Sequence, residues 1–97
     1  ISHLPHLLAG TLCLVAAAAP RDLRRFAGPG FRDTTRVASG SPAVWDSIVA
    51  DNRSEILSAL KDYRESLSAL IAAVEAGDKA VIAKRLRDAK EYRDGLV

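Results

Sequence analysis

The stretch GPGFRDTTRVASGSPAVW, residues 28–45, decides how the chain folds because it stands as a tight corner between two helix-like runs. Three glycines and two prolines surround the polar turn FRDTTR, and the only tryptophan of the sequence, Trp45, closes the stretch. Flexible linkers favour Gly and Ser without interleaved Phe, Arg and Asp. We therefore expect an ordered corner between helices.

Two arginines of this corner, Arg32 and Arg36, stand four residues apart and would share one face of a helical turn. A guanidinium offers a planar fork that suits a carboxylate or a phosphate. The simpler interpretation is a solvated arginine pair at a helix corner. Composition alone does not decide between the two.

Length and composition indicate one small all-α domain of 97 residues. Ala, Leu, Arg, Glu and Lys dominate the sequence, whereas β-branched and aromatic residues are sparse. The net charge of +2 gives only weak support for a polyanionic partner. A domain of this size buries only about 60–70% of its unfolded surface, so it often needs a partner. Because the chain has no Met and begins with Ile, we expect it to be part of a longer polypeptide.

The first helix is expected from Ser2, as its N-cap, through Pro5 in the first turn and onward. A helix that is apolar on all sides must be buried on all sides, so a second subunit or another part of the protein should cover it. Its regularly spaced apolar side chains are Leu4, Leu7, Leu8, Leu12 and Val15.

The uncharged run Leu7–Ala19 resembles neither a secretory signal nor a membrane span. No Lys or Arg precedes it, and it is shorter than the roughly 20 residues that cross a bilayer. The single cysteine, Cys13, excludes an internal disulfide framework and is expected to be a small buried hydrophobe. These features predict a cytoplasmic protein without a membrane partner.

Three amphipathic segments follow the corner. Ser41 and Pro42 predict a helix start, and Asn52 with Glu55 resembles a capping box at which the helix restarts. An apolar seam of heptad type then predicts packing against another helix of the domain or of a dimer partner. Its members are Ile56, Leu60, Tyr63, Leu67, Leu70 and Val74.

The last helix is expected to begin at Asp78, an N-cap that follows a helix-ending Gly77. It carries three cations that each precede an acid by four residues, which predicts a solvated outer face. These pairs are Lys84–Asp88, Arg87–Glu91 and Lys90–Asp94.

Two histidines, His3 and His6, project from one face near the start of the first helix. A shared metal ion would need a third ligand, which the sequence does not supply, so no metal is predicted. A structural histidine is one interpretation. A neutral histidine that hydrogen-bonds an anionic ligand near the helix start is another.

The five arginines between residues 21 and 36 do not predict a nucleic-acid interface. Asp22 and Asp33 interrupt the positive charge, and Phe26 and Phe31 alone make a thin stacking platform. The remaining arginines are expected to form a solvated loop face. They are Arg21, Arg24 and Arg25.

Two segments together resemble a known family. SHLPHLLAGTL at residues 2–12 and FAGPGFRDTTRVASGSPAVWDSIVADN at residues 26–52 look like the C-terminal helical domain of prephenate dehydrogenases, with arogenate dehydrogenases as close relatives. The resemblance covers nearly all 97 residues. Pro29 stands where glycine is commoner, and Val44 where methionine often precedes the tryptophan.

The resemblance implies that residues 1–97 form an all-α, C-terminal substrate-binding and dimerisation domain. It implies a long buried first helix, a short helical turn, two to three amphipathic helices and an intertwined homodimer. The family converts prephenate to 4-hydroxyphenylpyruvate in tyrosine biosynthesis, with NAD or NADP bound mainly by an N-terminal Rossmann domain. That domain is not in this sequence, so the fragment alone is expected to be inactive.

Within this family pattern we expect Arg36 to hold a substrate carboxylate, with His6 and Trp45 beside it in the pocket. Catalytic residues are expected upstream of the fragment. Arg32 and Asp33 are assigned a structural or interface role, in which an ion pair orders the turn. His3 is assigned a structural role.

Three alternatives to a prephenate dehydrogenase domain can be compared with the sequence, and it disfavours one of them. The domain could belong to an arogenate dehydrogenase, or it could be a helical interaction module without catalytic function. A helical chorismate mutase would suit the size, but the first helix of those enzymes carries arginine and aspartate, whereas residues 2–19 carry no charged Asp, Glu, Lys or Arg.

Overall fold

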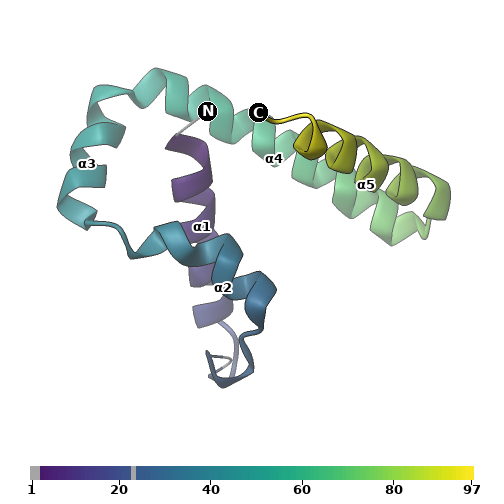
Figure 1. Cartoon of the computed structure of the whole chain (residues 1–97), viewed down its shortest axis with the longest axis horizontal. Coiled ribbons are helices and arrows are strands. Elements are labelled where there is room, and N and C mark those ends of the chain that lie inside the picture. The colour runs from purple at the N-terminus through teal and green to yellow at the C-terminus, as the bar shows by residue number, and fades with distance from the viewer. Residues whose placement is uncertain (1–2, 23) are drawn as a thin grey trace. The chain divides into compact units, whose positions relative to one another are not determined.

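The computed structural model describes residues 3–22 and 24–97, and within these ranges the chain forms helices and turns with no strand (Figure 1). The all-α prediction is therefore confirmed. Contacts divide the chain into two compact units, Ile1–Leu60 and Lys61–Val97. The helix α4 (Arg53–Ala76) is continuous through the boundary between them.

The first unit is built on α1 (His3–Ala17), which contains Pro5 in its first turn as predicted. The predicted cap Ser2 lies outside the described residues. Ala9 is buried at 3% exposure, but Leu14 and Val15 remain 71% and 66% exposed. The chain itself thus covers only part of a helix whose sequence is apolar all round, and the predicted partner would have to cover the rest.

The corner is helical and packs on α1. It contains η1 (Arg24–Phe26), α2 (Pro29–Thr35) and the 3-10 helix η2 (Arg36–Ser39), and both α2 and η2 contact α1. Thr35 is buried at 9% exposure, and its hydroxyl donates a hydrogen bond of 2.6 Å to the Phe31 carbonyl. An ordered corner, as the sequence predicted, therefore holds the start of η2 against the first helix.

The helix α3 (Pro42–Asp51) begins as predicted, with Pro42 in its first turn and the Ser41 hydroxyl accepting from the Val44 N–H at 3.5 Å. The helix also breaks at Asn52, where a restart was expected. The predicted capping box with Glu55 is wrong, however. The Asn52 side-chain amide donates backward to the Ile48 carbonyl at 2.8 Å, so it caps the end of α3 rather than the start of α4.

The second unit pairs the later part of α4 with α5 (Lys79–Asp94), and Figure 1 shows the two helices side by side. Gly77 ends α4 with a φ of 61°, and the Asp78 N–H bonds the Ala73 carbonyl at 3.0 Å in a Schellman arrangement. The Asp78 carboxylate caps α5 by accepting from the Val81 N–H at 3.1 Å, as predicted.

Polar contacts link α4 to α5 and also form along the exposed face of α5. The Arg85 guanidinium donates to the carbonyl and the hydroxyl of Ser66, both at 3.1 Å. The predicted pairs Lys84–Asp88 and Lys90–Asp94 are present on the exposed face. The third predicted pair, Arg87–Glu91, is not formed among the described residues, so that prediction is wrong.

The apolar seam of α4 is only partly covered within the second unit. Of its members there, Leu70 is half-buried, whereas Tyr63, Leu67 and Val74 are 44%, 45% and 60% exposed. Apolar side chains repeated at heptad spacing on one face normally pack against another helix. A face of this kind is therefore open to a partner.

Candidate functional site

The first helix and α3 meet through two of the predicted site residues. The imidazole of His6 stacks on the indole of Trp45, with ring centroids 3.7 Å apart and an interplanar angle of 15°. Both residues are half-buried. Each ring comes from the fourth residue of its helix, α1 or α3, and the corner between these helices brings the two rings together. His6 and Trp45 thus form one element, the His6–Trp45 stack.

His3 approaches the same indole edge to face, at a centroid distance of 6.0 Å and an angle of 81°. On its other side it lines a small cavity of about 60 Å³ between α1 and the start of α4. The carboxylate-bearing Glu55 and the buried Ile56 line this cavity as well. His3 therefore packs between elements, which agrees with the structural role predicted for it.

Gly40, at the end of η2, lies beside the edge of the His6–Trp45 stack. A Cβ atom at Gly40 would lie 2.7 Å from His6 Cε1 and 3.2 Å from Trp45 Nε1. In the sequence, Gly40 is only one of the three glycines of the corner. Nothing in the sequence predicts that Gly40 lies next to the rings. Its backbone angles are ones that any residue adopts, so no turn requires a glycine there.

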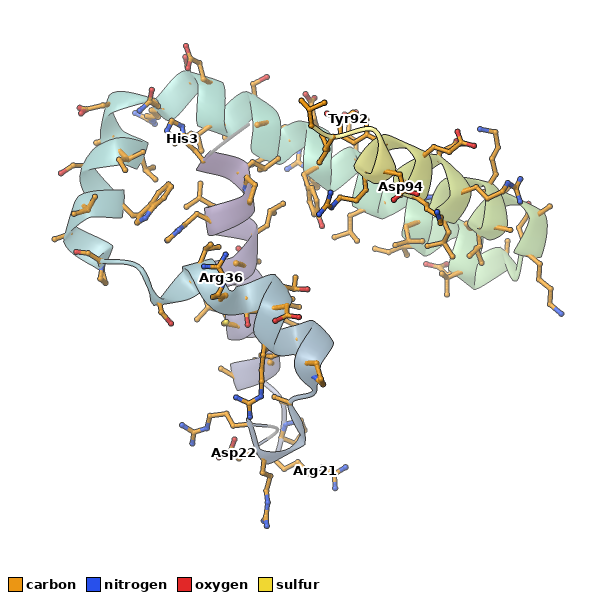
Figure 2. All side chains as sticks on the ribbon, in the orientation of Figure 1. His3, Arg21, Asp22, Arg36, Tyr92 and Asp94 are labelled. Carbon is orange, nitrogen blue, oxygen red and sulfur yellow. The ribbon has the colours of Figure 1, made fainter. Side chains whose placement is uncertain are left out.

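Arg36 opens the same 3-10 helix that Gly40 ends, and Figure 2 shows its side chain where η2 crosses α1. The residue is exposed. Within residues 3–22 and 24–97, no hydrogen bond or ion pair engages its guanidinium. The 3-10 helix η2 packs on α1. It begins at the cationic Arg36, and Gly40 at its other end lies next to His6. An anion could bind there through a charge-assisted pair of hydrogen bonds.

The predicted ion pair of Arg32 and Asp33 is not found among the described residues, where both side chains are exposed. The turn is ordered instead by the buried Thr35 and its bond to the Phe31 carbonyl. A helix can satisfy its local polar groups in this way without a charged pair.

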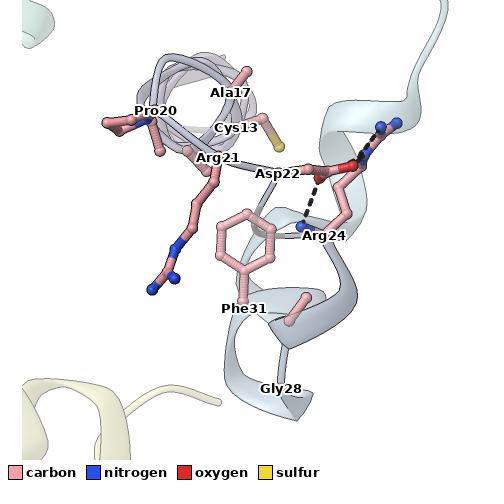
Figure 3. Close-up of a pocket in the computed structure, with 11 residues that line it drawn as sticks. Cys13, Ala17, Pro20, Arg21, Asp22, Arg24, Gly28 and Phe31 are labelled. Carbon is pink, nitrogen blue, oxygen red and sulfur yellow. Dashed lines mark hydrogen bonds and ion pairs between the residues drawn. The ribbon is translucent and has the colours of Figure 1, made fainter.

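A larger cavity of about 720 Å³ opens at the other end of α1, between that end, the η1 turn and the start of α2 (Figure 3). The half-buried Cys13 and the ring of Phe31 line it. Its described lining includes none of the three predicted site residues. Cys13 is less buried than the sequence predicted, because this face of α1 is open.

An exposed ion pair lies on the rim of this cavity, whose lining also includes Arg21. The Arg24 guanidinium donates to both carboxylate oxygens of Asp22, the shorter contact being 2.8 Å. Hydrogen bonds from the Arg24 side chain and backbone lower the pKa of Asp22 from 3.8 to about 2. Most of the other residues that line the cavity are small or apolar.

Among the residues that the structure describes, no three His, Cys, Asp or Glu side chains gather where they could hold a metal ion. No described helix has both the length and the apolar character that a transmembrane segment requires.

Comparison with known proteins identifies the matching domain. The family model described as "Prephenate dehydrogenase, dimerization domain" matches residues 1–88. The prephenate dehydrogenase of Bacillus subtilis (strain 168) is 36% identical over 99 residues, which cover 99% of this chain and 27% of that protein. The cyclohexadienyl dehydrogenase of Zymomonas mobilis is 28% identical over 98% of this chain and 34% of its own length. The chain thus spans about a third or less of these relatives.

Solved structures show the same domain. A Synechocystis arogenate dehydrogenase is 29% identical and superposes with a TM-score of 0.92, covering 99% of this chain and 36% of that one. A prephenate dehydrogenase from A. aeolicus, in complex with hydroxyphenyl propionate and NAD+, is also 29% identical, with a TM-score of 0.87. That match covers 96% of this chain and 34% of the other.

Proposed function

The chain belongs to the prephenate dehydrogenase family, whose dimerization-domain model it matches, and on this basis we propose that it is the substrate-binding and dimerisation domain of such an enzyme. The proposed reaction is the oxidative decarboxylation of prephenate to 4-hydroxyphenylpyruvate. The observation that carries the site is the His6–Trp45 stack beneath the 3-10 helix that Arg36 opens.

The proposed reaction sets what the protein must provide. The C–H bond at the ring carbon that bears the hydroxyl gives up a hydride to the nicotinamide cofactor. The bond from the ring to its carboxylate breaks and releases carbon dioxide, and the electron pair of that bond moves into the ring, which becomes aromatic. The substrate is a dianion, so positioning and charge stabilisation are the main tasks of the protein.

This chain's residues would serve the substrate. The Arg36 guanidinium, which pairs with no other side chain that the structure describes, can hold one carboxylate through two hydrogen bonds. The His6 imidazole can donate or accept a hydrogen bond beside it, and stacking on Trp45 fixes the plane of that ring. Each charge-assisted bond contributes about 1.5–3 kcal/mol to binding, so the arginine would dominate.

The described residues contain no strand and no glycine-rich strand-to-helix turn, so nothing in them fits a dinucleotide. NAD or NADP would therefore be bound by another domain of the complete enzyme. The A. aeolicus relative whose structure contains NAD+ is about three times as long as the part this chain covers, which supports that division.

A dehydrogenase assay on the complete protein tests the proposal. Prephenate and arogenate are each offered with NAD and with NADP, and reduced cofactor is followed by absorbance. We expect turnover of prephenate. Turnover of arogenate alone would instead favour the arogenate dehydrogenase alternative, which the Synechocystis neighbour supports. Absence of both activities, in a folded protein, would favour the interaction module.

Homodimerisation is the second part of the proposal. Support comes from the open apolar faces of α1 and α4 and from the description of the matched family model. Replacing the seam residue Leu67 by Asp should convert the complete protein to monomer in sedimentation equilibrium, because a carboxylate would have to be buried in an apolar interface. Glu65→Lys, an exposed change on the same helix, is the control. A wild-type monomer would contradict the dimer.

A further inference from the structure

Gly40 controls where the imidazole of the His6–Trp45 stack can lie. We propose that Gly40 is a positioning residue, whose missing side chain lets the end of η2 approach the edge of the His6 imidazole while that ring stays stacked on Trp45. The inference rests on the proposed function for its kinetic consequence, since only a substrate pocket makes the position of His6 matter. The packing of Gly40 against His6 and Trp45 does not depend on the proposed function.

The distances require a glycine at this place. A Cβ at position 40 would lie 2.7 Å from His6 Cε1 and 3.4 Å from His6 Nε2. Two carbon atoms are most stable about 3.5–4.0 Å apart, and they repel each other strongly at the 2.7 Å found for His6 Cε1. The Gly40 backbone and the imidazole are thus in direct contact, with no room for a methyl group between them.

Backbone conformation does not explain the glycine. Gly40 has φ −63° and ψ 165°, an extended conformation that alanine adopts as easily. Gly77, by contrast, has a φ of 61°, which side-chain-bearing residues avoid. Any effect of alanine at position 40 would therefore come from the contact with the rings and not from strain in the chain.

The imidazole cannot move away without cost. Trp45 covers one face of the imidazole at 3.7 Å, and a new Cβ would meet the edges of both rings, because the indole Nε1 would itself lie 3.2 Å from it. The indole is in turn fixed by the start of α3, where Ser41 and Pro42 set the first turn. A methyl group at position 40 must therefore slide the rings apart or lift η2 from α1.

The test substitutes Gly40→Ala in the complete protein and uses Gly30→Ala as the matched control. Gly30 is also exposed in the corner, and a Cβ there would meet nothing within 4 Å. Both changes are made again in a His6→Ala background, which removes the clashing ring. Steady-state kinetics with prephenate and thermal unfolding are measured for every variant.

We expect Gly40→Ala to raise KM about three- to tenfold with kcat within about twofold, because a displaced ring no longer meets the bound substrate correctly. It should also lower the melting temperature relative to wild type, whereas Gly30→Ala, inside α2 and without a clash, should not lower it. In the His6→Ala background, adding Gly40→Ala should change KM no further and should lower the melting temperature less than it does in wild type, because only the 3.2 Å approach to Trp45 Nε1 then remains.

Two results would overturn the inference. A loss of stability that is the same with and without the His6 ring would show that Gly40 acts on something else. An unchanged KM in an active Gly40→Ala enzyme would show that it does not position the site. If the complete wild-type protein has no dehydrogenase activity, the proposed function fails. The melting temperatures of Gly40→Ala and Gly30→Ala, each with and without His6→Ala, still decide whether Gly40 fixes the position of the imidazole.

Discussion

The imidazole of His6 and the indole of Trp45 stack at a centroid distance of 3.7 Å, although they belong to different helices on the two sides of the corner. An aromatic pair of this kind adds about 0.5–1.5 kcal/mol beyond the area it buries. The contact therefore joins α1 to α3 and at the same time fixes the plane of a ring that can exchange hydrogen bonds with a ligand.

Arg36 is predicted to bind the substrate carboxylate. In the complete enzyme Arg36→Ala should raise KM about ten- to a hundredfold, the loss expected for one charge-assisted contact. Arg36→Lys should also lose affinity, because an ammonium group lacks the planar fork. Arg32→Ala is the matched control, since Arg32 is an exposed arginine of the same corner. Equal KM values for the Arg36 and Arg32 variants would remove Arg36 from the site.

The two histidines should differ in their kinetic effects. His6→Ala is predicted to raise KM, because the ring lies flat on Trp45 beside η2. His3→Ala should leave KM within about twofold and act mainly on stability, because that ring packs edge to face at 6.0 Å and lines the small cavity against α4. Steady-state kinetics and thermal unfolding of both variants separate the roles. A larger KM effect for His3 would reverse the assignment.

Two helix-ending glycines should respond differently to alanine. Gly77 has a φ of 61°, so Gly77→Ala should destabilise the fold by about 1–2 kcal/mol. Gly95 ends α5 with a φ of −83°, and a Cβ there would make only ordinary contacts, at 3.5 Å and beyond. Gly95→Ala should therefore stay within about 0.5 kcal/mol of wild type. Urea unfolding measures both, and equal losses would contradict the explanation.

The Asp22–Arg24 pair predicts a pH dependence. Because Arg24 donates to the carboxylate, the pKa of Asp22 is lowered from 3.8 to about 2. The pair favours the folded chain above pH 3.8, and this contribution is lost as the pH falls through about 2. Carbon-13 NMR of the Asp22 carboxyl group follows the titration directly. Arg24→Gln should return the midpoint to near 3.8, and an unchanged midpoint would show that Arg24 is not the cause.

The sequence by itself determined the helices and most of their ends. Ser41 with Pro42, Gly77 and Asp78 act through hydrogen bonds to residues at most five positions away, so local chemistry predicts them well. The family resemblance singled out His6, Arg36 and Trp45 in the same way, from residue types at fixed spacing. Local chemistry failed at Asn52, whose side chain can cap the helix on either side.

Only the tertiary structure decided how these pieces meet. The stack of His6 on Trp45 and the contact of Gly40 with both rings join residues from α1, η2 and α3, and no spacing rule relates such positions. Gly40 has ordinary backbone angles, so nothing local marks it as a glycine needed for space. Contacts of this kind depend on the volume left between packed side chains, and that volume exists only after the corner has folded onto the first helix.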